Sequence, residues 1–102
     1  MEEVKIIGYQ DETLEIKLSG DIDLGNAEAF YAVVTNAYGE QKGNIVFDCE
    51  SLAFIDSTTL GTFVKIMKTL KADGYKLKLT GLQAKIKKLF LICSLDSVME
   101  IA

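Results

Sequence analysis

The sequence contains no histidine, no proline and no arginine. The absence of histidine excludes Ser-His-Asp and Cys-His catalysis and most zinc sites, and it removes the commonest general base near neutral pH. The absence of arginine removes the side chain best suited to a two-pronged grip on phosphate or carboxylate. No CxxC, GxGxxG or GxxxxGK[ST] motif occurs, so the sequence favours neither an enzyme nor a nucleotide-binding domain.

The size and composition of the chain indicate one globular domain, which we take as residues 1–102. The net charge of −4 argues against direct binding of nucleic acid. No apolar run is long enough to cross a bilayer, and the N-terminus does not resemble a signal peptide, so we expect a cytoplasmic protein without membrane insertion. The two cysteines, Cys49 and Cys93, follow or adjoin apolar residues, and we expect both to be reduced and buried, although a disulfide between them stays open.

The charges are distributed unevenly between the two halves of the chain. Residues 1–56 carry twelve acids and three lysines, whereas residues 57–102 carry three acids and eight lysines. The lysines at positions 85, 87 and 88 belong to a predicted helix, where a solvated face is their simplest interpretation.

Alternating apolar and polar residues predict two antiparallel strands near residues 4–9 and 13–19, followed by a loop, GDID, at residues 20–23. Apolar residues at helical spacing then predict a helix from residue 25 to about residue 38. Gly25 is the expected N-cap of this helix.

The second half of the chain alternates strands with helices. The apolar run NIVFDC at residues 44–49 is typical of a parallel strand covered on both faces. Helical spacing and then strand alternation predict a helix ending at Gly74, a strand at 76–80 and a third helix whose packing stripe runs from Leu82 through Leu89 to Cys93. Residues 98–101 would add a short strand or a docked tail. The order ββαβαβαβ predicts an α/β fold, a mixed β-sheet of four to five strands with helices packed against it.

Polar residues gather where the central strand passes into the second helix, in the stretch FIDSTTLG. One of Asp56, Ser57 or Thr58 is expected to cap the helix, an interaction worth about 1 kcal/mol. A hydroxyl in the first turn also lies at the positive end of the helix dipole, where a phosphate would be tolerated. The two roles, helix cap and modification site, are compatible.

Two other kinds of site are possible in principle, a carboxylate cluster and a Ser–Lys nucleophile. The acids Asp21, Asp23, Asp48 and Asp56 have no spacing that matches a calcium loop, so we expect no metal site. A nucleophile made of Ser57 and Lys65 is not expected, because the lysine lies two helical turns away.

These residues resemble the STAS domain family, and within it the bacterial anti-sigma factor antagonists (anti-anti-sigma factors). The resemblance rests on GDID (20–23), on NIVFDCESLAFIDSTTLG (44–61) and on LTGLQAKIKKLFLICSLDSVMEI (79–101). It covers nearly the whole chain. Thr59 departs from the pattern, because the family usually has glycine there; this would stiffen the helix start or alter how a kinase approaches.

The resemblance implies a regulatory protein that is not an enzyme. Its unphosphorylated form would bind an anti-sigma factor that is also a serine kinase, and the sigma factor would go free, which regulates transcription. Phosphorylation of Ser57, with Thr58 as second choice, would release the partner, and a phosphatase would reset the protein. The chain itself would need no cofactor, since ATP and Mg²⁺ belong to the kinase. Asp23, Asp56, Ser57, Thr58 and Gly61 would form the partner-binding surface.

Other functions are open to a STAS domain, since a fold does not fix a function. The first alternative is a scaffold or regulatory subunit of a stressosome-like assembly or of a transporter ATPase, which would not be switched at Ser57. The second is a ligand-binding or nucleotide-binding domain, against which the missing glycine-rich loop and the missing arginine both argue.

Overall fold

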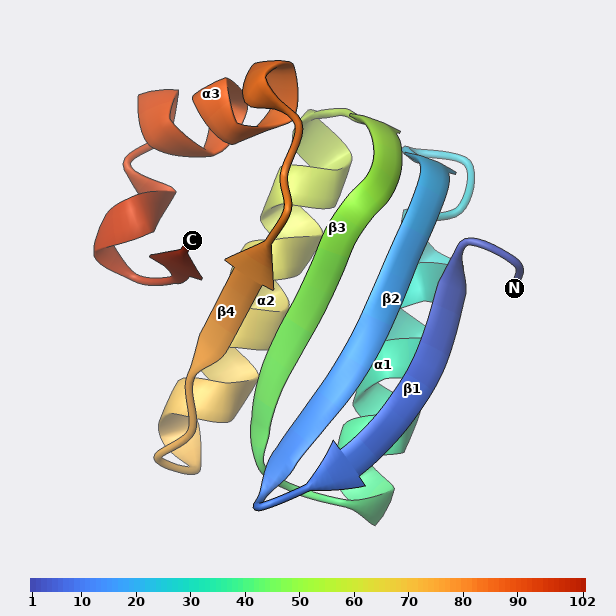
Figure 1. The fold of residues 1–102 in the computed structure, drawn as a ribbon, viewed down its shortest axis with the longest axis vertical. Coiled ribbons are helices and arrows are strands. Elements are labelled where there is room, and N and C mark those ends of the chain that lie inside the picture. The colour runs from blue at the N-terminus through green and yellow to red at the C-terminus, as the bar shows by residue number, and fades with distance from the viewer.

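The computed structural model describes residues 1–102 and contains one five-stranded sheet in the order β1-β2-β3-β4-β5 (Figure 1). Strand β1 runs antiparallel to β2, and all other neighbours are parallel. This confirms the predicted mixed sheet and order of elements. In chain order the elements are β1 (Val4–Gln10), β2 (Thr13–Ile22), α1 (Ala27–Glu40), β3 (Asn44–Ile55), α2 (Ser57–Ala72), β4 (Leu77–Thr80), α3 (Ala84–Ile92), the 3-10 turn η1 (Leu95–Ser97) and β5 (Glu100–Ile101).

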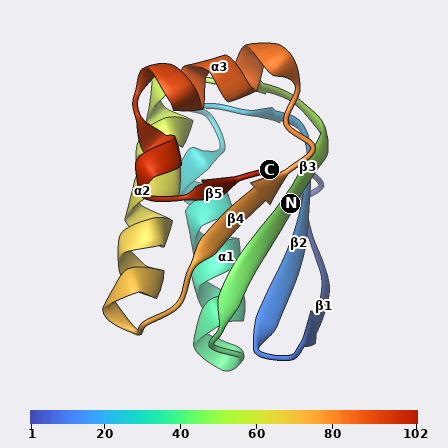
Figure 2. The ribbon, with the colours of Figure 1, turned by 60° about the vertical axis from the view of Figure 1, so that its left-hand side comes forward.

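Helices α1 and α2 lie on the same face of the sheet, and the other face carries no helix (Figures 1 and 2). The chain moves twice in the same direction across the sheet, from β2 to β3 and from β3 to β4. Right-handed crossovers, the rule for parallel connections, then place both helices on one side. The prediction that β3 is covered on both faces is wrong: Ile45 and Phe47 are buried, whereas Val46 and Asp48 between and after them are only half-buried.

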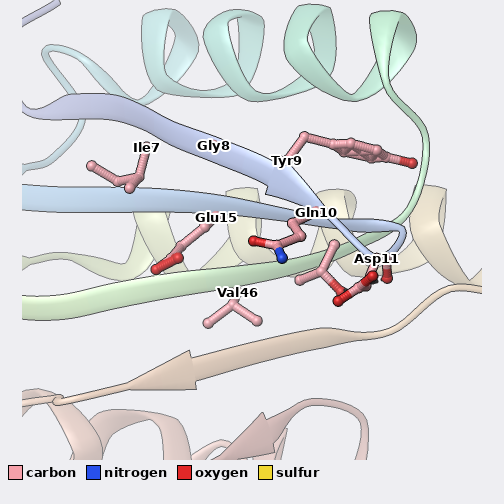
Figure 3. Close-up of a pocket in the computed structure, with 8 residues that line it drawn as sticks. Ile7, Gly8, Tyr9, Gln10, Asp11, Glu15 and Val46 are labelled. Atoms are coloured by element: carbon pink, nitrogen blue, oxygen red, sulfur yellow. Dashed lines mark hydrogen bonds between the residues drawn. The ribbon is translucent and has the colours of Figure 1, made fainter.

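The face without helices carries a hollow of about 680 Å³ beside the turn between β1 and β2 (Figure 3). Ile7, Gln10, Glu15 and Val46 contribute to its lining. Tyr9 points away from these side chains, and its hydroxyl donates to the Lys42 carbonyl oxygen at 2.7 Å. The hollow adjoins the first residues of β2, whereas GDID ends that strand, so the hollow is remote from the polar junction that the sequence singled out.

Four fully buried phenylalanines join the helices to the sheet. They are Phe30 of α1, Phe47 of β3, Phe63 of α2 and Phe90 of α3. The ring of Phe63 lies 5.2–5.4 Å from each of the other three, centroid to centroid, in edge-on or strongly tilted contacts. Such pairs contribute roughly 0.5–1.5 kcal/mol each beyond burial of their area. Phe63 therefore fixes α2, and with it the polar stretch at the start of that helix, against the rest of the fold.

Strand β2 is longer than predicted, because three residues of the expected GDID loop belong to it. Gly20 has φ +67°, a conformation that glycine tolerates without ending the strand. The register with β3 shifts around this point, and β2 then pairs on to Ile22, opposite Ile55. The consequence is that Asp23 directly follows a strand that is held in the sheet.

The C-terminal segment packs through fewer residues than predicted. Ile86 and Phe90 of α3 are buried, but Leu89 and Cys93 are exposed, contrary to the predicted packing stripe. Since α3 has only nine residues and nothing covers its outer side, one narrow stripe is all that it buries. Of the two free cysteines, Cys49 alone lies in the core. None of the three helices combines the length and the apolar character needed to pass through a bilayer.

Candidate functional site

The polar junctions after β2 and β3 lie side by side at one edge of the sheet, at the upper end in Figure 1. Since β2 and β3 are parallel, their carboxyl ends meet at the same edge, which is where parallel sheets usually bind their ligands. The backbone N–H of Leu24, after β2, donates to Asp56 Oδ2, after β3, at 2.9 Å. The structure therefore brings the GDID segment and the FIDSTTLG segment together, a placement that the sequence suggested only through its resemblance to a known family.

Asp56 is the N-cap of α2. Its backbone is extended, with φ −120° and ψ −174°, and Oδ1 accepts the N–H of Thr59 at 3.0 Å. The two oxygens of this carboxylate therefore accept from different segments. Oδ1 caps helix α2, and Oδ2 accepts the backbone N–H of Leu24. This decides between the three residues that the sequence left open as caps.

These hydrogen bonds also set the ionisation of Asp56. The N–H of Thr59 contributes most, and together with the N–H of Leu24 it holds the pKa of the Asp56 carboxyl below its usual value. Asp56 is therefore charged at neutral pH and places a fixed negative charge beside the first turn of α2.

Thr59 has a structural role that the sequence did not reveal. Its side chain is completely buried, and its hydroxyl lies 2.5 Å from the Ile22 carbonyl oxygen and 3.1 Å from Asp56 Oδ1. A glycine at this position would offer no such hydroxyl. Thr59 thus ties the start of α2 to the end of β2.

Ser57 and Thr58 are the first two residues of α2, and both are exposed. Neither hydroxyl takes part in the hydrogen bonds that Asp56 and Thr59 make. The hydroxyl of Ser57 is therefore accessible and is not needed for the cap. It has the properties of a group that another protein could modify.

Asn26 holds the segment after β2. The prediction that Gly25 is the N-cap of the first helix is wrong, because Asn26 occupies that position. Asn26 is the N-cap residue of α1, and its side chain turns back to the segment before it. Its Oδ1 accepts the N–H of Asp23 at 2.8 Å, and its Nδ2 donates to the Asp21 carbonyl at 2.9 Å. Asp23 Oδ1 in turn accepts the N–H of Gly25 at 2.9 Å. The spacing Asp-x-x-Asn before an apolar helix was the available signal.

Gly61 lies in α2 one turn after Ser57 and is exposed. A methyl group at this position would meet no other atom within 4 Å. Packing within the chain therefore does not explain a glycine in a helix interior, where it costs about 1 kcal/mol relative to alanine. Its place in a partner-binding surface stays a prediction.

The other chemical possibilities find no supporting geometry. No group of three or more acidic or cysteine side chains is placed to hold a metal ion. The Nζ of Lys65 lies 4.8 Å from the centre of the Tyr31 ring, a cation–π contact that holds this lysine against α1. The acids at the sheet edge are instead engaged in hydrogen bonds with backbone N–H groups.

Comparison with known proteins agrees with this fold. A model of the STAS domain family matches residues 6–102. The anti-sigma-B factor antagonist of Staphylococcus aureus (strain NCTC 8325 / PS 47) is 29% identical over 92 residues, which cover 90% of this chain and 85% of the relative. The protein of the same description from Bacillus subtilis (strain 168) is 27% identical over 96 residues, covering 94% and 87%.

Among solved structures, the Bacillus cell fate determinant SpoIIAA in its phosphorylated form superposes with a TM-score of 0.76 at 25% identity, covering 97% of this chain and 90% of SpoIIAA. The chain belongs to the STAS domain family. The fold and the family inferred from the sequence are both confirmed.

Proposed function

We propose that this protein is an anti-sigma factor antagonist that regulates transcription by binding an anti-sigma factor with serine kinase activity. The unphosphorylated form occupies that partner, and the sigma factor goes free. Phosphorylation on Ser57 releases the partner. Relatives described as anti-sigma-B factor antagonists support this proposal. The observation that carries it is the exposed Ser57 hydroxyl, which stands at the start of α2 next to a cap that does not use it.

The chemistry assigned to this chain is that of an acceptor. The Ser57 oxygen attacks the terminal phosphorus of ATP bound to the kinase, ADP leaves, and the hydroxyl proton passes to a base of the kinase. The chain carries no histidine and no phosphate-binding loop, which supports the view that ATP and Mg²⁺ are brought by the partner. A phosphatase then hydrolyses the phosphoserine and restores the hydroxyl. On this proposal the protein acts in the cytoplasm as a regulatory binding protein and is the substrate of an enzyme, not an enzyme itself.

The effect of phosphorylation follows from the charges near Ser57. A phosphate adds about −1.5 to −2 charges at neutral pH. The backbone N–H groups at the start of α2 favour such a charge, whereas Asp56 next to it and Asp23 in the adjoining segment oppose it. The fold can therefore accept the phosphate while the negative potential of this edge increases. A partner that docks on the unphosphorylated surface then loses affinity.

The test is to incubate the protein with the anti-sigma factor kinase of the same organism, ATP and Mg²⁺, and to map the phosphate by mass spectrometry. We expect one phosphoryl group on Ser57 and none on the Ser57→Ala variant. The matched control is Thr58→Ala, which should be phosphorylated like the wild type. Phosphorylation of Ser57→Ala at the wild-type rate would contradict the assignment of Ser57. Loss of phosphorylation in Thr58→Ala alone would assign the site to Thr58.

A second measurement tests the switch itself. Ser57→Asp adds a negative charge at the same position and should weaken binding of the kinase. Binding as tight as that of the wild type would show that charge at Ser57 does not control release.

A further inference from the structure

Two large apolar side chains are exposed near the Asp56 cap: Leu24, whose N–H binds the Asp56 carboxylate, and Phe54, which pairs with Asp21 in the sheet. Leu24, in the segment after β2, is 75% exposed, the highest value among the large hydrophobic residues. Phe54, near the end of β3, is 47% exposed, although its neighbour Ile55 is buried in the core. An aromatic ring and an isobutyl group left in water lose the free energy that burial would provide, unless a partner covers them.

The backbone at Leu24 is held in place before any partner binds. Its N–H is engaged by Asp56 Oδ2 at 2.9 Å. The residues on either side are fixed by hydrogen bonds from Gly25 to Asp23 and between Asp23 and Asn26. An apolar side chain on a preorganised segment contributes more to binding, because little backbone entropy remains to be lost.

Three carboxylates lie in the segments that carry these two side chains. Asp21 is exposed, and Asp23 and Asp56 are partly exposed. No lysine occurs in residues 18–41 or 43–64, which include both segments. A protein that covers Leu24 and Phe54 must therefore bring positive charges opposite these carboxylates.

We infer that Leu24 and Phe54 are the apolar anchors through which the anti-sigma factor kinase docks, on a kinase surface that offers an apolar pocket bordered by lysine or arginine. The inference rests on the proposed function and identifies which residues of this chain provide the binding energy. A few central apolar side chains ringed by polar groups are the usual source of affinity in such interfaces. A phosphate on Ser57 would add negative charge at the residue that follows Asp56, whose carboxylate holds the Leu24 backbone.

The experiment measures the dissociation constant of the purified kinase, loaded with ADP and Mg²⁺ so that no phosphoryl transfer occurs, by isothermal titration calorimetry. Leu24→Ala and Phe54→Ala are each expected to raise Kd by about tenfold or more, as for central residues of an interface. The matched control is Ile92→Ala on α3, which removes a side chain that is 68% exposed and should leave Kd within about twofold. Melting curves of all three variants exclude unfolding as a cause.

The outcomes separate the two claims. If the wild-type protein does not bind the kinase, the proposed function fails and this inference fails with it. If the wild type binds, and the Kd values of Leu24→Ala and Phe54→Ala are both within about twofold of the wild-type Kd, the proposed function stands and the assignment of the two anchors is wrong. A loss in Ile92→Ala equal to that in Leu24→Ala would also overturn the inference, because it would place the interface on α3.

Discussion

The hydroxyl of Thr59, at the start of α2, lies 2.5 Å from the carbonyl oxygen of Ile22, which ends β2 thirty-seven residues earlier. With the hydrogen bond from Leu24 N–H to Asp56, it adds a side-chain link to the pairing of Ile22 with Ile55 between the segments that form the candidate site. The position of the first turn of α2 relative to the GDID segment is therefore set by direct bonds as well as by the hydrophobic core.

The first prediction concerns Thr59. Thr59→Val keeps the shape of the side chain but leaves the Ile22 carbonyl without its donor, at a cost of roughly 1–3 kcal/mol in the free energy of unfolding. Urea unfolding of Thr59→Val and of the wild type measures this difference in the free energy of unfolding. Thr59→Ser, which keeps the hydroxyl, should lose less, and Thr58→Val on the exposed side should stay within about 0.5 kcal/mol of the wild type. Equal stability of Thr59→Val and the wild type would show that the bond contributes nothing.

The second prediction concerns pH. Because the folded protein lowers the pKa of Asp56, its carboxylate adds stability that is complete above the pKa of the unfolded chain, about 3.9, and is lost as the pH falls through the lower folded value. Asp56→Asn keeps one oxygen, which can accept the N–H of Thr59. The amide NH₂ that replaces Oδ2 cannot accept the N–H of Leu24. The urea midpoint of Asp56→Asn should be below that of the wild type at pH 7. The difference between the two midpoints should become smaller as the pH falls from 4 to 2. A gap that stays constant over this range would contradict the role of the charge.

The third prediction concerns Gly61. Gly61→Ala replaces an exposed helical glycine where a methyl group meets no atom, so the free energy of unfolding should rise by about 0.5–1 kcal/mol. If Gly61 belongs to the partner-binding surface, the same variant should bind the kinase less tightly despite its greater stability. Gly39→Ala, also helical and uncrowded, is the matched control and should stabilise without changing Kd. Unchanged binding by Gly61→Ala would remove Gly61 from that surface.

The fourth prediction concerns the two thiols. Cys49 is fully buried, and burial, aided by Asp48, raises the pKa of its thiol to about 12, whereas Cys93 is exposed. A thiol-specific reagent, which reacts with the thiolate, should therefore label one cysteine of the native protein at pH 8 and both cysteines of the protein unfolded in urea. Cys93→Ser should abolish native labelling and Cys49→Ser should not. Rapid labelling of both thiols in the native state would contradict the buried position of Cys49.

The sequence predicted the parts of this fold that follow from periodicity and chain order. The alternation in β1 and β2, the helical stripe of α2 and the order of elements were enough for the mixed sheet. What it did not predict depends on tertiary contacts. Gly20 looked like the end of a strand, but the pairing of Ile22 with Ile55 carries β2 through it. Cys93 fitted a helical stripe, but nothing packs on the side of α3 that carries it.

The candidate site was predicted in outline and not in mechanism. Asp23 was placed beside Asp56 and Ser57 only through the family resemblance, and the parallel pairing of β2 with β3 gives the physical reason for this placement. The division of roles between neighbours could not be read from four polar residues in a row. Only the coordinates show that Asp56 caps, that Thr59 reaches across to Ile22 and that Leu24 is held by a carboxylate from the other segment.

The separation of the cap at Asp56 from the free hydroxyl at Ser57 has a consequence for the lifetime of the protein. Since the Ser57 hydroxyl takes no part in the hydrogen bonds of Asp56, a phosphate on it would leave the cap and its backbone partners in place. Both forms then keep nearly the same population of unfolded chains, which is what cellular proteases act on. Signalling at this residue would redistribute a constant pool of molecules between two states and would not change the size of the pool, so each phosphorylated molecule remains available for another cycle.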